Sequence, residues 1–79
     1  MYYVYILKSI LDGSNYIGTT SDLKRRLQEH NSKGCKFTTA KQPYKIIWYS
    51  VFKDKIKAYK FEKYLKSGSG IAFLKKRLI

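Results

Sequence analysis

The hydrophobic positions divide the chain into strand-like and helix-like segments. Aromatic and β-branched residues dominate 2–8, 16–19 and 44–52, a pattern typical of strands. Asp12-Gly13 lies between the first two segments, and this pair favours a turn. We therefore expect a hairpin at the start of the chain, although the residues alone leave its register open.

Apolar residues at helical spacing predict three helices after capping residues or a chain break. Thr20-Ser21-Asp22 supplies N-cap candidates for the first helix, and Asp54 can cap the second. We expect these helices at 23 to about 31, at 54 to 65 or 66, and at 71–78, with the Ser/Gly run of 67–70 as the break. The element order β-β-α-β-α-α predicts an α/β domain with a small three-stranded, mainly antiparallel sheet flanked by helices. At 79 residues with 44% hydrophobic content, the chain forms one domain over 1–79, which excludes a doubly wound fold, a barrel and a disordered tail.

The two longer predicted helices carry polar residues on their apolar faces. The i, i+3, i+4, i+7 stripes are Leu23, Arg26, Leu27 and His30 in the first helix, and Ala58, Phe61, Glu62 and Leu65 in the second. A charge at the edge of a core is costly unless it is paired or liganded. One interpretation is a partly buried salt bridge of Glu62 with Arg26 or a lysine. The other is a carboxylate that holds a divalent cation beside an arginine that holds phosphate.

The charge balance directs attention to polyanions. The chain has 17 Lys plus Arg against 5 Asp plus Glu, for a net charge of +12. This excess predicts binding to nucleic acid first and to an acidic membrane surface second, while a lysine-rich composition without such a partner is the plain alternative. The basic loop over 32–43 is expected to contact phosphates rather than to read base sequence.

The cysteine count and the lack of long apolar runs indicate the cell compartment and the possible cysteine chemistry. Cys35 is the single cysteine, so no internal disulfide or cysteine metal cluster can form, and we expect an ordinary thiol. The sequence shows neither an apolar run of 18 residues nor a signal-peptide pattern. These features predict a cytoplasmic protein without membrane contact.

The tyrosines and one glycine allow both structural and chemical interpretations. Tyr3 and Tyr5 point to one face of the first strand, and Tyr16 opens the second. Such tyrosines usually line a core edge, and they act as bases only with a tuned pKa or beside metal-bound water. Gly18 predicts a close backbone approach or a bulge. For His30, a phosphate contact or an acid-base role is more plausible than lone metal ligation.

In order and spacing, these residues resemble the GIY-YIG nuclease superfamily, in particular its small stand-alone bacterial members. The resemblance rests on Tyr3-Val4-Tyr5, on the stretch YIGTTSDLKRRLQEH from Tyr16 to His30, and on the helical Glu62. It implies a three-stranded antiparallel sheet flanked by helices. It also implies hydrolysis of a DNA phosphodiester by in-line attack.

The resemblance implies a role for each matching residue. Tyr5 and Tyr16 line the active site, and Tyr16 deprotonates the attacking water or relays its proton. Arg26 holds the scissile phosphate, and Glu62 binds one divalent metal, usually Mg²⁺ (or Mn²⁺). His30 matches a histidine whose role varies, and Gly18 is the glycine of the second motif.

The chain departs from the family pattern at three places. Tyr3 stands where the family name has glycine, Thr19 stands where some relatives have a lysine, and no asparagine follows Asn31.

The sequence therefore predicts a metal-dependent DNA endonuclease in DNA repair or processing. Its expected substrates are branched, nicked or single-stranded DNA, selected by structure rather than by base sequence. The alternative is a nucleic-acid-binding module that has the nuclease fold and little or no turnover. A basic protein-interaction or ribosome-associated domain is the third possibility.

Overall fold

The computed structural model describes residues 1–32 and 41–78. Its elements are β1 (Tyr2–Ser9), β2 (Asn15–Thr20), α1 (Leu23–His30), β3 (Tyr44–Phe52), α2 (Lys55–Leu65) and α3 (Gly68–Arg77). This order and the three-stranded sheet confirm the predicted fold class. Cys35 and most of the predicted basic loop lie outside the described residues. Within the described part, no helix has the length and apolar character needed to cross a bilayer.

The sheet has the strand order β2-β1-β3, and both pairings are antiparallel. β1 is central, so side chains on both of its faces are covered, and Val4, Tyr5, Ile6 and Leu7 are all buried. The turn between β1 and β2 contains Gly13 at a φ of +76°, a conformation that glycine adopts without steric cost. The predicted Asp12-Gly13 turn is thus confirmed. The resulting register places Tyr5 opposite Gly18.

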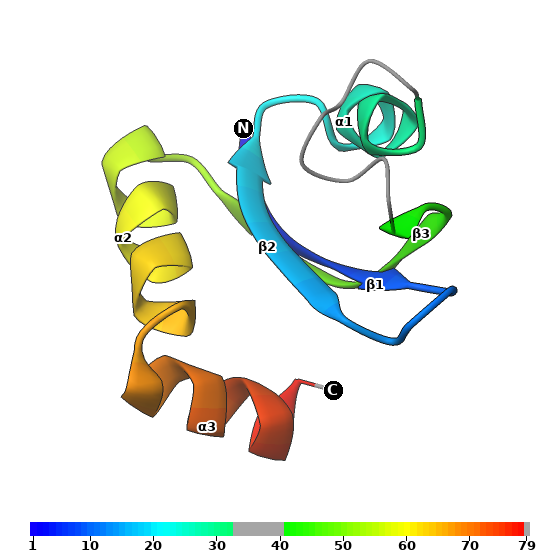
Figure 1. Cartoon of the computed structure of the whole chain (residues 1–79). Helices are drawn as coiled ribbons and strands as arrows, with labels where there is room; N and C mark the ends of the chain where they lie inside the picture. Colours follow the sequence, from blue (N-terminus) through cyan, green and yellow to red (C-terminus); the bar gives the residue numbers. More distant parts are fainter. Residues whose placement is uncertain (33–40, 79) are drawn as a thin grey trace.

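The alternation of β1 side chains builds a separate core on each face of the sheet. Figure 1 shows α1 on one side of the sheet, and α2 with α3 on the other. On the α2 and α3 side, the buried residues are Val4, Ile6, Ala58, Leu65 and Leu74. On the α1 side they are Tyr5, Leu7 and Tyr44, with Leu23 and Leu27 of α1 packed against them. Residues next to each other on β1 therefore face different helices.

The first two helices begin where their capping residues predict. The Asp22 carboxylate accepts a hydrogen bond from the Arg25 backbone N–H at 3.0 Å, and that of Asp54 accepts one from Ile56 at 2.8 Å. Each side chain satisfies a donor that the first helical turn leaves without a partner. These contacts set the residues at which α1 and α2 begin, and so the positions of Arg26 and Glu62 within their helices.

The third helix corrects the prediction. It begins at Gly68 rather than at 71, so the expected break over 67–70 reduces to one capping residue, Ser67. The Ser67 hydroxyl accepts a hydrogen bond from the Gly70 backbone N–H at 3.2 Å. A Cβ on Gly70 would lie 1.6 Å from the carbonyl oxygen of Tyr64. The glycine is there because α3 starts directly against the end of α2, not because the chain is irregular.

Candidate active site

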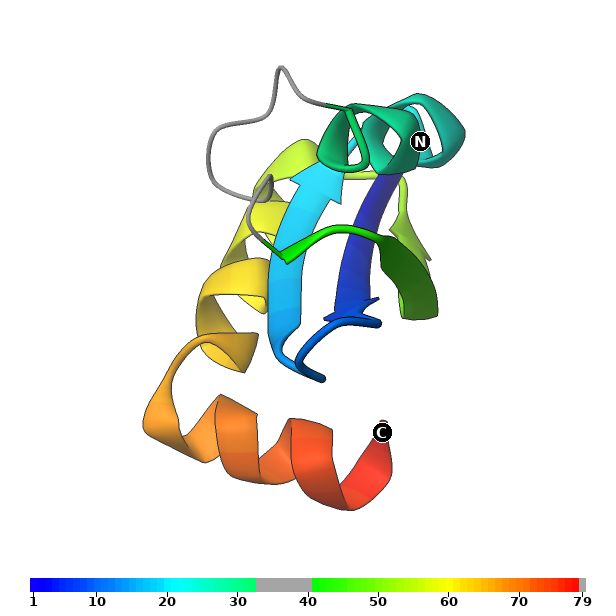
Figure 2. The same cartoon turned by 45° about the vertical axis from the view of Figure 1, so that its right-hand side comes forward.

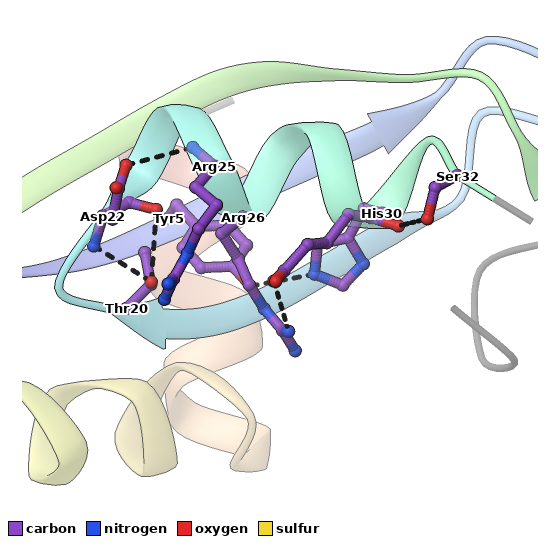
Figure 3. Close-up of polar contacts among 8 residues, drawn as sticks. Tyr5, Thr20, Asp22, Arg25, Arg26, His30 and Ser32 are labelled. Carbon is purple, nitrogen blue, oxygen red and sulfur yellow. Dashed lines mark hydrogen bonds and ion pairs between the residues drawn. The ribbon is translucent and has the colours of Figure 1, made fainter. Parts of the chain in front are cut away.

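Tyr5 is the centre of a hydrogen-bonded cluster beneath α1. Its side chain projects from β1 and is 1% exposed. The hydroxyl lies 3.0 Å from Nε2 of His30 and accepts a hydrogen bond from Nε of Arg26 at 3.4 Å (Figure 3). Arg26 and His30 are four residues apart on α1, so both side chains reach the same phenol. The predicted inward placement of these two residues is confirmed.

The cluster holds its protons in a defined pattern. Burial raises the pKa of Tyr5 to about 12, although the hydrogen bond and charge of Arg26 act to lower it. Burial, with the nearby charge of Arg26, lowers the pKa of His30. The hydrogen bond with Tyr5 raises the pKa of Arg26. At neutral pH, Arg26 is therefore charged, while Tyr5 and His30 are neutral.

Tyr16 extends the cluster toward the edge of the sheet. Its ring centroid lies 4.5 Å from that of His30 and 6.5 Å from that of Tyr5. β2 is an edge strand, and Tyr16 remains partly exposed. The structure thus brings Tyr5, Tyr16, Arg26 and His30 together at one side of the sheet.

Gly18 makes room for the Tyr5 ring. A Cβ at position 18 would lie 2.4 Å from the Tyr5 hydroxyl oxygen and 2.6 Å from Cζ. No side chain fits between the ring and the strand. The expected close approach is confirmed, and the group that approaches the glycine backbone is the phenol of the facing residue.

Glu62 lies on the α2 side of the sheet. The Thr19 hydroxyl donates a hydrogen bond to its Oε1, and Nζ of Lys66 lies 2.8 Å from its Oε2. Within residues 1–32 and 41–78, no ion pair joins Glu62 to Arg26, which instead pairs with Glu29 at 3.1 Å. The salt bridge considered from the sequence is therefore made with a lysine and not with Arg26.

The edge strand connects Glu62 to the tyrosine cluster. Thr19 lies opposite Val4 and faces α2, whereas the adjacent Gly18 lies opposite Tyr5 on the other face. The Glu62 charge acts across this strand, and it is one of the smaller causes that raise the pKa of Tyr5. Glu62 therefore approaches the same region as Arg26 and Tyr5, but from the opposite face of the sheet.

The surroundings of Glu62 fit a hard divalent cation that shares its coordination with substrate. The Glu62 side chain is 20% exposed, and Thr19 orients it. Mg²⁺ often takes one or two protein carboxylates and fills its remaining positions with water and phosphate oxygens. The described residues hold no group of three or more His, Cys, Asp or Glu side chains that would enclose a metal. The ammonium of Lys66, with a half-exposed side chain, has to leave the carboxylate when a cation binds.

Thr19 and Lys66 contact Glu62 in the candidate site, and the sequence analysis did not name them as site residues. Lys66 follows Glu62 at i+4, which is the spacing of a helical ion pair, so the sequence carried that signal. Thr19 was noted only as a departure from a lysine found in some relatives. Its contact with Glu62 depends on how α2 packs on β2.

Comparison with known proteins shows the family of the chain. The model of the GIY-YIG catalytic domain matches residues 1–71. The chain belongs to the GIY-YIG family. A UPF0213 protein of Streptococcus pneumoniae serotype 4 is 48% identical over 65 residues, which cover 81% of this chain and 65% of the relative. A UPF0213 protein of Clostridium perfringens is 40% identical over 67 residues, which cover 84% of this chain and 71% of that relative.

A solved UPF0213 structure has the same fold. The solution NMR structure of a UPF0213 protein from Bacillus halodurans superimposes with a TM-score of 0.57 at 36% identity, covering 96% of this chain and 84% of that one. The chain spans just under two thirds of the length of the pneumococcal relative.

Proposed function

We propose that this chain hydrolyses DNA phosphodiester bonds with one divalent metal ion held by Glu62, in cytoplasmic DNA repair or processing. The proposal rests on one observation above all. The hydrogen-bonded cluster of Tyr5, Arg26 and His30 lies across a single edge strand from a partly exposed carboxylate. The net charge of +12 attracts DNA of any sequence, and we propose that selection among DNAs is by their structure.

Arg26 is the residue that we assign to the scissile phosphate. Its side chain is 37% exposed, and the hydrogen bond with Tyr5 orients the guanidinium. Phosphodiester cleavage places additional negative charge on the phosphoryl oxygens, and a fixed cation stabilises that charge. A guanidinium also contacts two phosphate oxygens at once, which lysine cannot do.

The two tyrosines and the histidine have different protonation roles. Tyr5 stays protonated because of its raised pKa, so we assign it to positioning Arg26 rather than to general base catalysis. His30 is neutral, and its Nε2 can accept the hydrogen bond of the Tyr5 hydroxyl. Tyr16, at the exposed edge, orients the attacking water or relays its proton.

A bound Mg²⁺ or Mn²⁺ supplies Lewis-acid stabilisation of the phosphate and of the leaving oxygen. Thr19 holds one oxygen of the Glu62 carboxylate in a fixed position. Lys66 pairs with the other oxygen, and a bound cation would replace its ammonium there. The affinity of the protein for metal should therefore rise when DNA supplies further oxygen ligands.

A nucleic-acid-binding module with little or no turnover is the second candidate. The observation that favours it is the pairing of both Glu62 oxygens, one with Thr19 and the other with Lys66. Thr19 also replaces a lysine that some relatives have. Binding without cleavage would still use the basic surface, and it would weaken with salt by about 0.9 log units per log salt for each phosphate neutralised.

Cleavage of a panel of labelled DNAs separates the two candidates. The panel holds branched, nicked, single-stranded and fully paired DNA, each tested with Mg²⁺, with Mn²⁺ and with EDTA. We expect the parent to cut in the presence of metal and Glu62→Gln to bind without cutting. Asp54→Asn is the matched control, because it removes another carboxylate at α2 and asparagine still caps a helix.

Three outcomes decide against parts of the proposal. If the parent binds with normal salt dependence and cuts no DNA, the chain is the binding module. Equal cutting by Glu62→Gln and the parent would exclude Glu62 as the metal ligand. Cutting that persists in EDTA would exclude a metal-dependent reaction.

A further inference from the structure

A groove with a cavity volume of about 380 Å³ opens between the first residues of β2 and α3. Figure 2 shows α3 passing the hairpin end of the sheet, at the opposite end from α1. The groove is lined by Tyr16, Ile17, Lys66, Ile71, Leu74 and Lys75, together with Asn15. Its volume is within the range of small-molecule sites. The roles assigned above leave this groove without an occupant.

The walls of the groove combine an apolar surface with positive charge. Ile17, Ile71 and Leu74 form the apolar part, and Ile71 is 42% exposed although it lies on a packed helix. Lys66 and Lys75 also line the groove, and the ammonium of Lys66 pairs with Glu62. None of the described lining residues is acidic. An apolar slot beside cations suits a nucleobase together with its phosphate.

Two residues of the groove, Tyr16 and Lys66, also contact residues of the candidate active site. Tyr16 lines the groove and also contacts His30, with ring centroids 4.5 Å apart. Lys66 lines the groove and also pairs with Glu62 at 2.8 Å. A DNA strand bound in the groove would therefore lie next to Tyr16 and next to the Lys66–Glu62 pair.

We propose that this groove binds one unpaired nucleotide of the DNA next to the bond that is cut. The inference rests on the proposed nuclease function and names its substrate class. A base in duplex DNA has to leave its stack and its partner before it enters such a slot, whereas a base at a flap, nick or branch is already free or nearly so. The groove thus selects DNA structure without reading base identity, because every base presents an apolar face.

Binding of two flap DNAs tests the groove independently of cleavage. The probe is a labelled nicked duplex with one unpaired flap nucleotide, compared with the same DNA whose flap nucleotide lacks its base. Affinities are measured by fluorescence anisotropy in EDTA. We expect the parent to bind the intact flap at least about fivefold more tightly. Ile71→Glu should abolish this ratio, and Ala72→Glu should keep it.

The two substitutions on α3 form a matched pair. Both add a carboxylate to the first turns of the same helix, but residue 71 lines the groove and residue 72 does not. Ile71→Ser, a neutral change, should reduce the ratio as well, and circular dichroism shows which variants fold. Lys75→Gln should weaken binding of both DNAs equally and reduce the salt slope by about 1. Lys76→Gln, at a residue that does not line the groove, should weaken both DNAs less than Lys75→Gln does.

The other possible outcomes of the flap-binding experiment decide against the groove proposal or against the nuclease. Equal affinity of the parent for the two flaps overturns the groove proposal, as does an equal loss of the ratio in Ile71→Glu and Ala72→Glu. A dimer that Ile71→Glu dissociates would assign the groove to a second copy instead. Normal cleavage with equal flap affinities contradicts only the groove, and base discrimination without cleavage contradicts only the nuclease.

Discussion

Gly18→Ala tests whether the Tyr5 ring is held where the structure places it. The added Cβ would lie 2.4 Å from the phenol oxygen and 2.6 Å from Cζ, closer than real Cβ atoms approach other groups. The ring has little room to yield, because Tyr5 is 1% exposed and its hydroxyl bonds with His30 and Arg26. The substitution should therefore push the phenol out of its site.

The expected loss of stability follows from three contributions. Overpacking a closely packed core costs about 1–3 kcal/mol, and disrupting the Tyr5 to His30 hydrogen bond costs about 1 kcal/mol more. The lower entropy of alanine in the unfolded chain offsets about 0.5 kcal/mol. The free energy of unfolding should fall by about 1.5–3.5 kcal/mol, which lowers Tm by about 6–28 °C in a domain of this size.

Urea and thermal unfolding, followed by circular dichroism, measure this effect. Gly68→Ala is the control, because a Cβ there meets nothing within 4 Å, and its stability should equal or slightly exceed that of the parent. In a Tyr5→Leu background, Gly18→Ala should cost less than about 0.5 kcal/mol, because the ring that it meets is gone. The reasoning is refuted if Gly18→Ala is as stable as the parent, or if it costs the same in both backgrounds.

Two further predictions concern single residues of the core. The lowered pKa of His30 means that its neutral form stabilises the fold above the unfolded pKa near 6.5. This stability is lost as the pH falls below that value, so the free energy of unfolding should decline from about pH 7 to about pH 5. The decline should be smaller in His30→Gln. If the free energy of unfolding falls equally with pH in the parent and in His30→Gln, the assignment to His30 is wrong. Gly70→Ala puts a Cβ 1.6 Å from the Tyr64 carbonyl oxygen and should destabilise the chain by more than about 3 kcal/mol, whereas a loss below about 1 kcal/mol in chemical unfolding would show that α3 shifts freely.

The helical period predicted which polar residues face inward. Asp22 and Asp54 cap their helices as expected, so the rotation of each helix follows from its first turn. Arg26, His30 and Glu62 then lie on the covered faces, where the sequence placed them. These features are local, since they depend on contacts within one helical turn.

Other features depend on how distant segments meet. The Ser/Gly run suggested a break, because glycine is a poor helix former, yet α3 begins within it. The end of α2 lies against Gly70 and leaves no space for a side chain. Helix propensity depends on the residue alone and not on its contact with the end of α2. The start of α3 could therefore not be predicted from propensity.

The partners of Glu62 also include one that is local in sequence and one that is distant. The sequence allowed a salt bridge of Glu62 with Arg26, but the two helices pack on opposite faces of the sheet. Glu62 therefore pairs with Lys66 of the following turn and with Thr19 of the edge strand. Lys66 could be predicted from its i+4 spacing, whereas Thr19 required the packing of α2 on β2.

The sequence by itself determined the elements, their order and the inward residues, because caps, periodicity and strand alternation act over a few residues. Only the tertiary structure decided that Tyr5 lies on Gly18, and that Arg26 and Glu62 approach one edge strand from opposite faces. Those arrangements depend on strand register and helix packing, which join residues tens of positions apart. The groove beside Tyr16 likewise exists only because α3 packs next to β2.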